Sequence, residues 1–441
     1  MKYSIDYKFH SLGLLAGLLL IHGQLMAQQS SRLVSTDELF QLGIENSLRI
    51  KASKMQEIMM DDQQKTALTG RLPNLQIGIN AAYSGNPLVF EQGLSHPVSP
   101  NVPNWSQNYS ITLNQTIYQG GKIQYSIRKA DIEKQIAAIA TTDDMGEVKL
   151  FLLQEYMTLL NYYKQRDVLS RNIEESQRRL QDIKRMKKEG ILTRNDEIRS
   201  ELQLTNDQLA HQETTNSITI ASQELDILLG LDESLLIVPD TSVLYRNFEL
   251  DNYESYVELA YDNYPGMKIA SRNIEIAEND TKITRANYLP SIALLAGNTL
   301  ARPLTNPLED RYNNKWNIGL SLSYNLSSIY QNRHQVHQAQ QMVELRRNAQ
   351  EQLKQNIRIQ IRSAYIRHQE SINRVQALEL SVSQASENYR IVHNRYLNQL
   401  SILTDLLDAS NVRLAAELQL ATARAQTIYT YYELQRACGN L

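Results

Sequence analysis

Three carboxylates beside two expected turns are the residues whose types and spacing best fit a functional cluster. Asp196 follows Thr193 by three residues, which is the spacing of a helix capping box. Asp405 and Asp408 are also three residues apart and fall in the first turn of an expected helix, where negative charge is favoured. At this point helix capping alone accounts for all three carboxylates.

The other candidates for chemistry are weak. His334 and His337 have a spacing that can present two metal ligands on one helix face, but no third ligand is evident and the neighbouring residues are rich in glutamine. The sequence has no His-Glu-x-x-His motif, phosphate-binding loop or nucleophile elbow. We therefore predict no catalytic, cofactor or metal site, and a protein that is not an enzyme.

Long helices must position the acidic residues. Between Gly319 and Gly439 there is no glycine or proline, the two residues that most often end helices. Apolar residues recur at three- and four-residue steps from Leu400 to Tyr432, as in helices that supercoil around neighbours. We predict an antiparallel hairpin whose tip lies near residues 398–401 and whose second helix is capped at Thr404-Asp405.

The first half of the chain follows the same plan. A helix is predicted from Gly121 to Glu189, roughly 100 Å long at a rise of about 1.5 Å per residue. It turns at Gly190-Ile191-Leu192-Thr193 and returns to about Leu229. Residues 231–250, which include a proline, are expected to be an irregular connector.

Four stretches alternate apolar and polar side chains, which is the pattern of strands with one apolar face. Their apolar positions are Leu75, Ile77, Ile79, Ala81 and Tyr83; Tyr109, Ile111 and Leu113; Ile292, Leu294 and Ala296; and Trp316, Ile318, Leu320, Leu322 and Tyr324. Strands of about ten residues are long enough to cross a bilayer when tilted. Four of them cannot close a barrel, and open edges in lipid leave backbone groups unpaired. Three chains would supply twelve strands and a lumen, so we expect a homotrimer in lipid. The alternative is that these are half-buried strands of an ordinary soluble sheet.

The order of these patterns repeats along the chain. Leu72-Pro73 recurs as Leu289-Pro290 before corresponding strands, and Asp196 recurs as Asp405 after corresponding tips. We predict repeats at residues 33–230 and 251–441.

Residues 1–27 carry two lysines before an apolar core and are expected to be a signal peptide. The formal net charge of −3 argues against nucleic acid as a partner.

Four motifs resemble those of the TolC-type outer-membrane efflux proteins, over about residues 33–441. They are Leu72-Pro73 with Leu289-Pro290; Gln115-Thr116-Ile117-Tyr118-Gln119-Gly120-Gly121; Gly190-Ile191-Leu192-Thr193-Arg194-Asn195-Asp196; and Arg395-Tyr396 through Thr404-Asp405-Leu406-Leu407-Asp408-Ala409. The resemblance implies a mostly α-helical protein with membrane β-structure and an internal duplication. Its trimeric 12-stranded β-barrel would lie in the outer membrane of a Gram-negative-type bacterium and continue into a periplasmic α-helical barrel.

The resemblance also implies roles for residues at the two tips. Asp405 and Asp408 would ring the periplasmic entrance, and Tyr396 would hold it shut by a hydrogen bond to Asp196. The tip residues would dock on a periplasmic adaptor; they are Gly190, Ile191, Leu192, Thr193, Gln399, Leu400 and Ser401. Gln399 stands where the family usually has glycine, which puts the geometry of this turn in question.

The predicted function is a passive duct of a tripartite efflux or type I secretion system. Its partners would be the adaptor, an inner-membrane transporter of the RND, ABC or MFS type, and outer-membrane lipid. The alternative is a periplasmic coiled-coil scaffold or tether without channel activity. A tether has no need for alternating strands, so the strands favour the duct.

Overall fold

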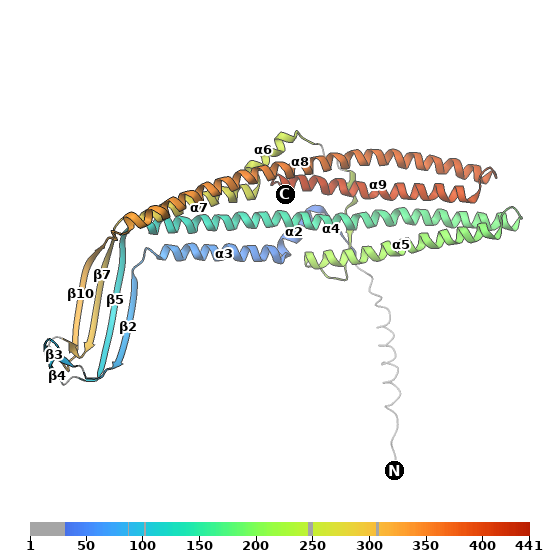
Figure 1. Cartoon of the computed structure of the whole chain (residues 1–441). Helices are drawn as coiled ribbons and strands as arrows, with labels where there is room; N and C mark the ends of the chain where they lie inside the picture. The colour runs from blue at the N-terminus through green and yellow to red at the C-terminus, as the bar shows by residue number, and fades with distance from the viewer. Residues whose placement is uncertain (1–30, 87, 101–102, 246–249, 306–307) are drawn as a thin grey trace, which may run out of the picture. The chain divides into compact units, whose positions relative to one another are not determined.

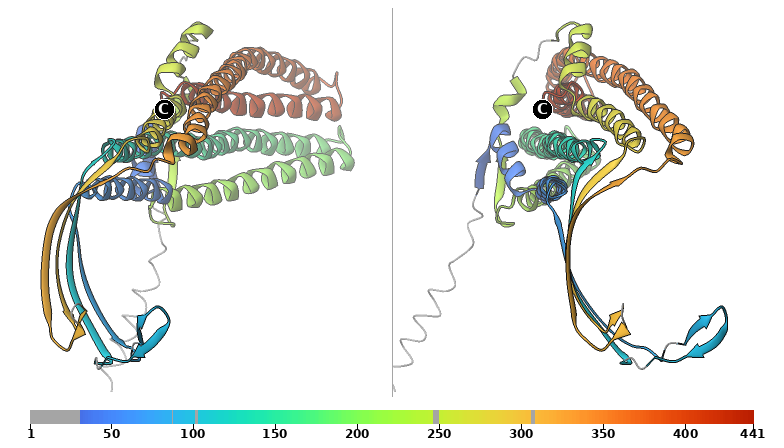
Figure 2. Two further views of the ribbon diagram at one scale, coloured as in Figure 1. Left: turned by 60° about the vertical axis from the view of Figure 1, so that its left-hand side comes forward. Right: turned by 90° about the vertical axis from the view of Figure 1, so that its left-hand side faces the viewer.

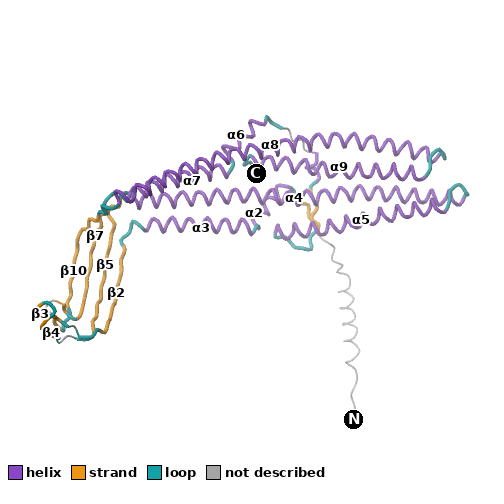
Figure 3. Tube along the Cα trace, in the orientation of Figure 1, coloured by secondary structure: helices purple, strands orange, loops and turns teal. Residues whose placement is uncertain are grey.

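The structure is a computed structural model that describes residues 31–441 except 87, 101–102, 246–249 and 306–307. The signal peptide predicted at residues 1–27 lies outside the described residues. Figures 1 and 3 show the order of the elements. The first are β1 (Ser31–Val34), α2 (Thr36–Asn46), α3 (Leu48–Thr69), β2 (Asn74–Tyr83), β3 (Val89–Gln92), β4 (Ser95–Val98), β5 (Trp105–Gln119), α4 (Lys122–Lys188) and α5 (Arg194–Leu229). The others are β6 (Leu236–Pro239), the 3-10 helix η1 (Thr241–Tyr245), α6 (Tyr253–Asn263), α7 (Pro265–Ala286), β7 (Ser291–Arg302), β8 (Leu304–Thr305), β9 (Leu308–Glu309), β10 (Asn313–Ser323), α8 (Ser328–Leu397) and α9 (Leu403–Ala437).

The chain folds into two compact units. The described residues of the first unit are 31–51, 143–264 and 357–441, and those of the second are 52–142 and 265–356. The long helices α4 and α8 contribute to both units. Each unit therefore takes segments from both halves of the sequence, and the units do not coincide with the repeats predicted at 33–230 and 251–441.

The second unit contains a four-stranded antiparallel sheet in the order β10-β7-β5-β2. The strands lie side by side in Figure 1, and the views in Figure 2 show that the sheet is curved. Hairpin connections join β2 to β5 and β7 to β10, as the alternating patterns predict. The outer strands β2 and β10 each have one neighbour in this sheet. One edge of each is therefore unpaired within the sheet.

The register of the strands brings the four apolar alternations onto one face. Ile77 of β2 lies opposite Ile111 of β5, and Ala296 of β7 lies opposite both Leu113 and Ile318. Residues directly opposite in antiparallel strands share a face of the sheet. The predicted strands are confirmed. Ile318 nevertheless exposes 65% of its surface, so none of the described residues covers this face there.

The first unit is built on two antiparallel helical hairpins, α4 with α5 and α8 with α9. In each pair the helices run side by side in both views of Figure 2. The helices α4 and α8 have 67 and 70 residues, which confirms the long helices expected from the absence of helix-breaking residues. No helix among the described residues is both long and apolar enough to cross a membrane.

Apolar side chains along the hairpins form the core of the first unit. Leu153, Tyr156 and Leu160 of α4 are fully buried with Leu225 of α5. The apolar repeat predicted from Leu400 to Tyr432 was wrong at its first residue. Leu400 is 68% exposed because it lies in the turn before the helix, where the helical period does not apply.

The connector at 231–250 is not wholly irregular. Its residues Leu236–Pro239 form β6, which pairs in parallel with β1. The pair is anchored by α4, since the Tyr156 hydroxyl donates to the Val34 carbonyl at 2.6 Å and accepts from the Asp240 amide at 2.8 Å. A strand of four residues is too short to show a period, and its partner lies about 200 residues away, so the sequence carries no local signal for it.

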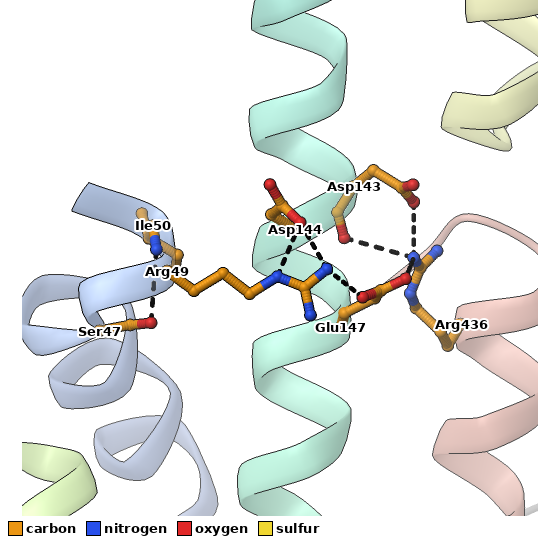
Figure 4. Close-up of polar contacts among 7 residues, drawn as sticks. All are labelled: Ser47, Arg49, Ile50, Asp143, Asp144, Glu147 and Arg436. Carbon is orange, nitrogen blue, oxygen red and sulfur yellow. Dashed lines mark hydrogen bonds and ion pairs between the residues drawn. The ribbon is translucent and has the colours of Figure 1, made fainter. Parts of the chain in front are cut away.

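An ion-pair network fixes the end of α9 against α4 (Figure 4). The Arg436 guanidinium lies 2.5 Å from the Asp143 carboxylate and 3.7 Å from Glu147, which also pairs with Arg49. A Cβ at Gly146 would lie 3.0 Å from Arg436 Nε. Glycine at this position, the only one within α4, thus lets the arginine side chain cross the helix.

Candidate functional site

The tip between α4 and α5 has the predicted turn and cap. Gly190 has a φ of 78°, and its amide donates to the Lys187 carbonyl at 3.0 Å. The Thr193 amide donates to the Asp196 carboxylate at 2.9 Å, and the Asp196 amide donates to the Thr193 hydroxyl at 3.3 Å. This reciprocal pair is the expected capping box. The bonds from Thr193 hold the pKa of Asp196 below its usual value.

The tip between α8 and α9 has the same backbone turn without glycine. Gln399 has a φ of 61°, a left-handed conformation that glycine adopts with less strain. Its amide donates to the Tyr396 carbonyl at 3.0 Å, and the Leu400 amide donates to the Arg395 carbonyl at 2.8 Å. The amides of Gly190 and of its successor make the corresponding bonds at the first tip. The replacement of glycine therefore leaves the geometry of the turn unchanged.

The first turn of α9 begins earlier than predicted. Its N-cap residue is Ile402, not Thr404, because the Asp405 carboxylate reaches back over the start of the helix. This carboxylate accepts bonds from the Ser401 hydroxyl at 2.8 Å and from the Ile402 amide at 3.4 Å. The side chains of Asp405 and Asp408 are exposed. Both carboxylates are thus accessible at the tip, as either a cap or a cation ring requires.

Tyr396 lies behind this turn in a small apolar cluster with Ile183, Leu403 and Leu406. It is 5% exposed, and its hydroxyl has no hydrogen-bond partner among the described residues. The hydrogen bond expected from Tyr396 to Asp196 is therefore absent, since Asp196 is engaged by Thr193. Burial, and secondarily the negative charge of Asp196, raise the pKa of Tyr396 to about 12.

The apolar residues of the two tips differ in exposure. Ile191 is 44% exposed, while Leu400 and Ile402 are 68% and 65% exposed. Leu192 instead packs against the cluster around Tyr396. Of the apolar residues predicted to dock, Ile191 and Leu400 are thus available at the surface, whereas Leu192 supports the tip from inside.

Polar contacts join the two hairpins near their tips, and sequence reasoning missed them. Arg199 of α5 donates to the Thr404 hydroxyl of α9 at 2.7 Å. Further from the tip, Arg413 of α9 pairs with Glu175 of α4. Only helix packing brings together residues more than 200 positions apart, and no local pattern marks such pairs.

The two histidines considered as metal ligands lie on an exposed part of α8. His334 and His337 are both exposed. Within the part of the chain that the structure describes, no three histidine, cysteine or acidic side chains gather as a metal site would require.

Residues 256–440, which span most of α6 through α9, match the family model described as "Outer membrane efflux protein". The expected resemblance to TolC-like outer-membrane efflux proteins is confirmed over these residues. A comparison of the chain with curated sequences gives no match.

Solved structures with a similar fold match over 92% of this chain. The outer membrane protein VceC from Vibrio cholerae is 16% identical, matches over 96% of its own chain and has a TM-score of 0.73. The Campylobacter jejuni outer membrane channel CmeC is 16% identical, with 85% of its chain covered and a TM-score of 0.67. The open state of the Neisseria gonorrhoeae outer membrane channel MtrE is 16% identical, with 88% covered and a TM-score of 0.65.

Proposed function

We propose that three copies of this chain form a passive efflux duct through the outer membrane. The sheet β10-β7-β5-β2 carries the proposal, because one of its faces is apolar and uncovered and its two outer strands each have an unpaired edge. Backbone groups cannot stay unpaired in lipid. Pairing of β2 with β10 of the next copy would close a barrel of twelve strands around a lumen.

Aromatic side chains at the ends of the strands support a membrane position. Tyr83 and Trp105, beside the loop between β2 and β5, are exposed and lie with their rings 5.5 Å apart. Tyr118 and Tyr324, exposed by 41% and 43%, lie near the other ends of their strands. Such residues form girdles at the two lipid interfaces of membrane barrels.

Conductance tests the duct directly. The detergent-extracted protein should cross-link to a trimer, fractionate with the outer membrane and form ion-conducting channels in planar bilayers. A water-soluble monomer that never conducts would instead support the periplasmic scaffold or tether, the alternative function. That alternative leaves the exposed apolar face of the sheet without a role.

The hairpins of three chains would form a periplasmic tube that docks on an adaptor and, through it, on an inner-membrane transporter of the RND, ABC or MFS type. The exposed side chains of Ile191 and Leu400 suit a contact at the tips. Replacing both with aspartate should abolish export, because a charge at an apolar contact is costly to bury, while the trimer remains in the membrane. Wild-type export by this variant would place docking elsewhere. Leu192 is unsuitable for this test because it packs inside the tip.

The periplasmic entrance is proposed to lie at the same tips. Three copies of Asp405 and Asp408 would place six carboxylates around it, which favours cations. Replacing both with asparagine should weaken cation selectivity in bilayers.

Tyr396 would hold the closed tip by packing, so Tyr396→Phe should leave conductance unchanged and Tyr396→Ala should raise it. An equal rise in both variants would instead assign the effect to the hydroxyl.

A further inference from the structure

A hollow of about 450 Å³ lies at the end of the sheet that adjoins the helices, where β5 passes into α4 (Figure 1). Arg71 and Tyr118 line it together with Tyr125 of the first turn of α4. A Cβ at Gly121 would lie 3.0 Å from the Tyr125 ring, so the glycine lets this ring lie against the turn. The volume is in the range of sites that hold a small ligand or the polar part of a larger one.

The Arg71 side chain makes no ion pair or hydrogen bond with any residue that the structure describes, and it is exposed. Its backbone is held in place, because Gln115 Nε2 donates to the Arg71 carbonyl at 3.1 Å. A guanidinium is always charged and carries only hydrogen-bond donors. Arg71 therefore brings a free positive charge and unused N–H groups to the hollow from a fixed point of the chain.

The junctions between the helices and this end of the strands carry positive charge only. They comprise residues 70–73, 115–125, 282–290 and 324–334. These segments contain no aspartate or glutamate, and their basic residues are Arg71, Lys122, Lys282, Arg285 and Arg333. The Lys282 ammonium also lies 5.9 Å from the centre of the Tyr125 ring. A charge distribution of this kind favours an anion, whereas a group with its own ammonium finds no carboxylate in these segments.

An irregularity in β5 turns the hollow towards the apolar face of the sheet. The register of β5 against β7 shifts between Thr116 and Tyr118. Leu113 and Tyr118 are an odd number of positions apart, so in a regular strand they would point to opposite faces. After the shift Tyr118 lies opposite Ile292, which belongs to the apolar alternation of β7. Tyr118 is 41% exposed and thus continues the uncovered apolar face to the rim of the hollow.

We propose that this hollow binds the headgroup of an anionic glycerophospholipid in the periplasmic leaflet of the outer membrane. The Arg71 guanidinium binds the phosphate, for which its planar set of donors is suited. The acyl chains continue past Tyr118 over the apolar face of the sheet, a contact that a free phosphate cannot make. The site rests on the proposed channel function and adds to it a lipid class that holds the duct at its depth in the membrane.

Native mass spectrometry of the detergent-extracted trimer tests the site. The protein is titrated with phosphatidylglycerol and, separately, with phosphatidylcholine, and the lipid molecules retained per trimer are counted. The wild type should retain phosphatidylglycerol in preference, up to one molecule per chain. Arg71→Gln should weaken its apparent affinity about fivefold, the factor that one basic residue contributes near anionic lipid. Arg71→Lys should weaken it less, because the charge is kept.

A matched control removes the same charge away from the hollow. Arg346 is exposed and lies 18 residues after the start of α8, roughly 27 Å along the helix at about 1.5 Å per residue. Arg346→Gln should leave the retention of phosphatidylglycerol unchanged. Each variant is first shown to remain a trimer in detergent. Equal retention by Arg71→Gln and Arg346→Gln would overturn the site, since net charge alone would then account for binding.

The other outcomes separate the lipid site from the channel itself. A water-soluble monomer that never conducts overturns the channel function and the lipid site together. A conducting trimer that retains the two lipids equally overturns only the site. If glycerol phosphate at millimolar concentration displaces the retained lipid, the acyl chains contribute nothing and the ligand is a soluble phosphate. Selective retention that is lost in Arg71→Gln and resists glycerol phosphate supports the lipid site.

Discussion

Apolar side chains have opposite surroundings in the sheet and in the helical hairpins. Leu153 and Leu160 of α4 are fully buried by their own chain, whereas Ile318 and Leu320 of β10 are 65% and 72% exposed. The hairpins follow the ordinary rule for a protein in water, in which burial of apolar area stabilises the fold. The sheet does not, so its apolar face needs an environment that the single chain lacks. Four predictions test this difference and its limits.

The largest effect on stability is expected from truncating a buried leucine of the hairpins to alanine. The same kind of truncation in the sheet is the comparison. Leu153→Ala should lower the free energy of unfolding by about 2–5 kcal/mol, because it leaves a cavity in a packed core. Ile318→Ala leaves no such cavity and should cost clearly less. Thermal unfolding of the detergent-solubilised trimer, followed by helix circular dichroism, measures both. Equal destabilisation would mean that the sheet packs against protein rather than lipid.

A charge on the apolar face of the sheet sharpens the comparison. Ile318→Arg should cost about 2–4 kcal/mol near the bilayer midplane, whereas Ser321→Arg, on the opposite face, should cost less. The amount of assembled trimer in the outer-membrane fraction measures the difference. Equal tolerance of arginine at the two positions would contradict the assignment of faces.

The hairpin region includes a buried carboxyl group that departs from this rule. Asp226 of α5 is fully buried, and neither carboxylate oxygen has a hydrogen-bond partner among the described residues. Burial, and then the charges of Asp232 and Glu233, raise the pKa of Asp226 to about 6 from 3.8. The folded state then binds the proton more tightly than the unfolded state, so stability should fall as pH rises from about 4 to about 6.

Replacing this carboxylate tests its cost. Asp226→Asn should raise the free energy of unfolding by about 1–3 kcal/mol at pH 7, because the neutral amide avoids the cost of ionising a buried carboxyl group, and by less at pH 4. Thermal melts at the two pH values measure it, and Glu213→Gln at an exposed position of α5 is the control. A variant that is no more stable than wild type at pH 7 would show that the carboxylate is satisfied in solution.

The smallest effect is expected at a tip, where neither lipid nor a core decides the conformation. Gln399→Gly should stabilise the protein by about 1 kcal/mol, because a residue with a side chain is strained in the left-handed region. Thermal melts measure the gain, and export should be unchanged. The reverse change, Gly190→Gln, should destabilise by a similar amount, since the two turns share their hydrogen bonds.

The sequence by itself determined the elements whose signals are local. Periods of two residues located the strands around Ile77 and Ile318, and the absence of glycine and proline located the long helices. The capping box of Thr193 and Asp196 was also predictable, because a cap depends on residues only three positions apart.

Only the tertiary structure decided which distant residues meet. It brought Glu175 to Arg413 across 238 positions, laid Arg436 over Gly146 and paired β1 with β6. It also buried the Tyr396 hydroxyl away from Asp196, contrary to the sequence-based expectation. Such contacts depend on the depth and rotation at which long helices pack. Packing of this kind is set by side chains throughout the interface and leaves no period or spacing at the residues that finally touch.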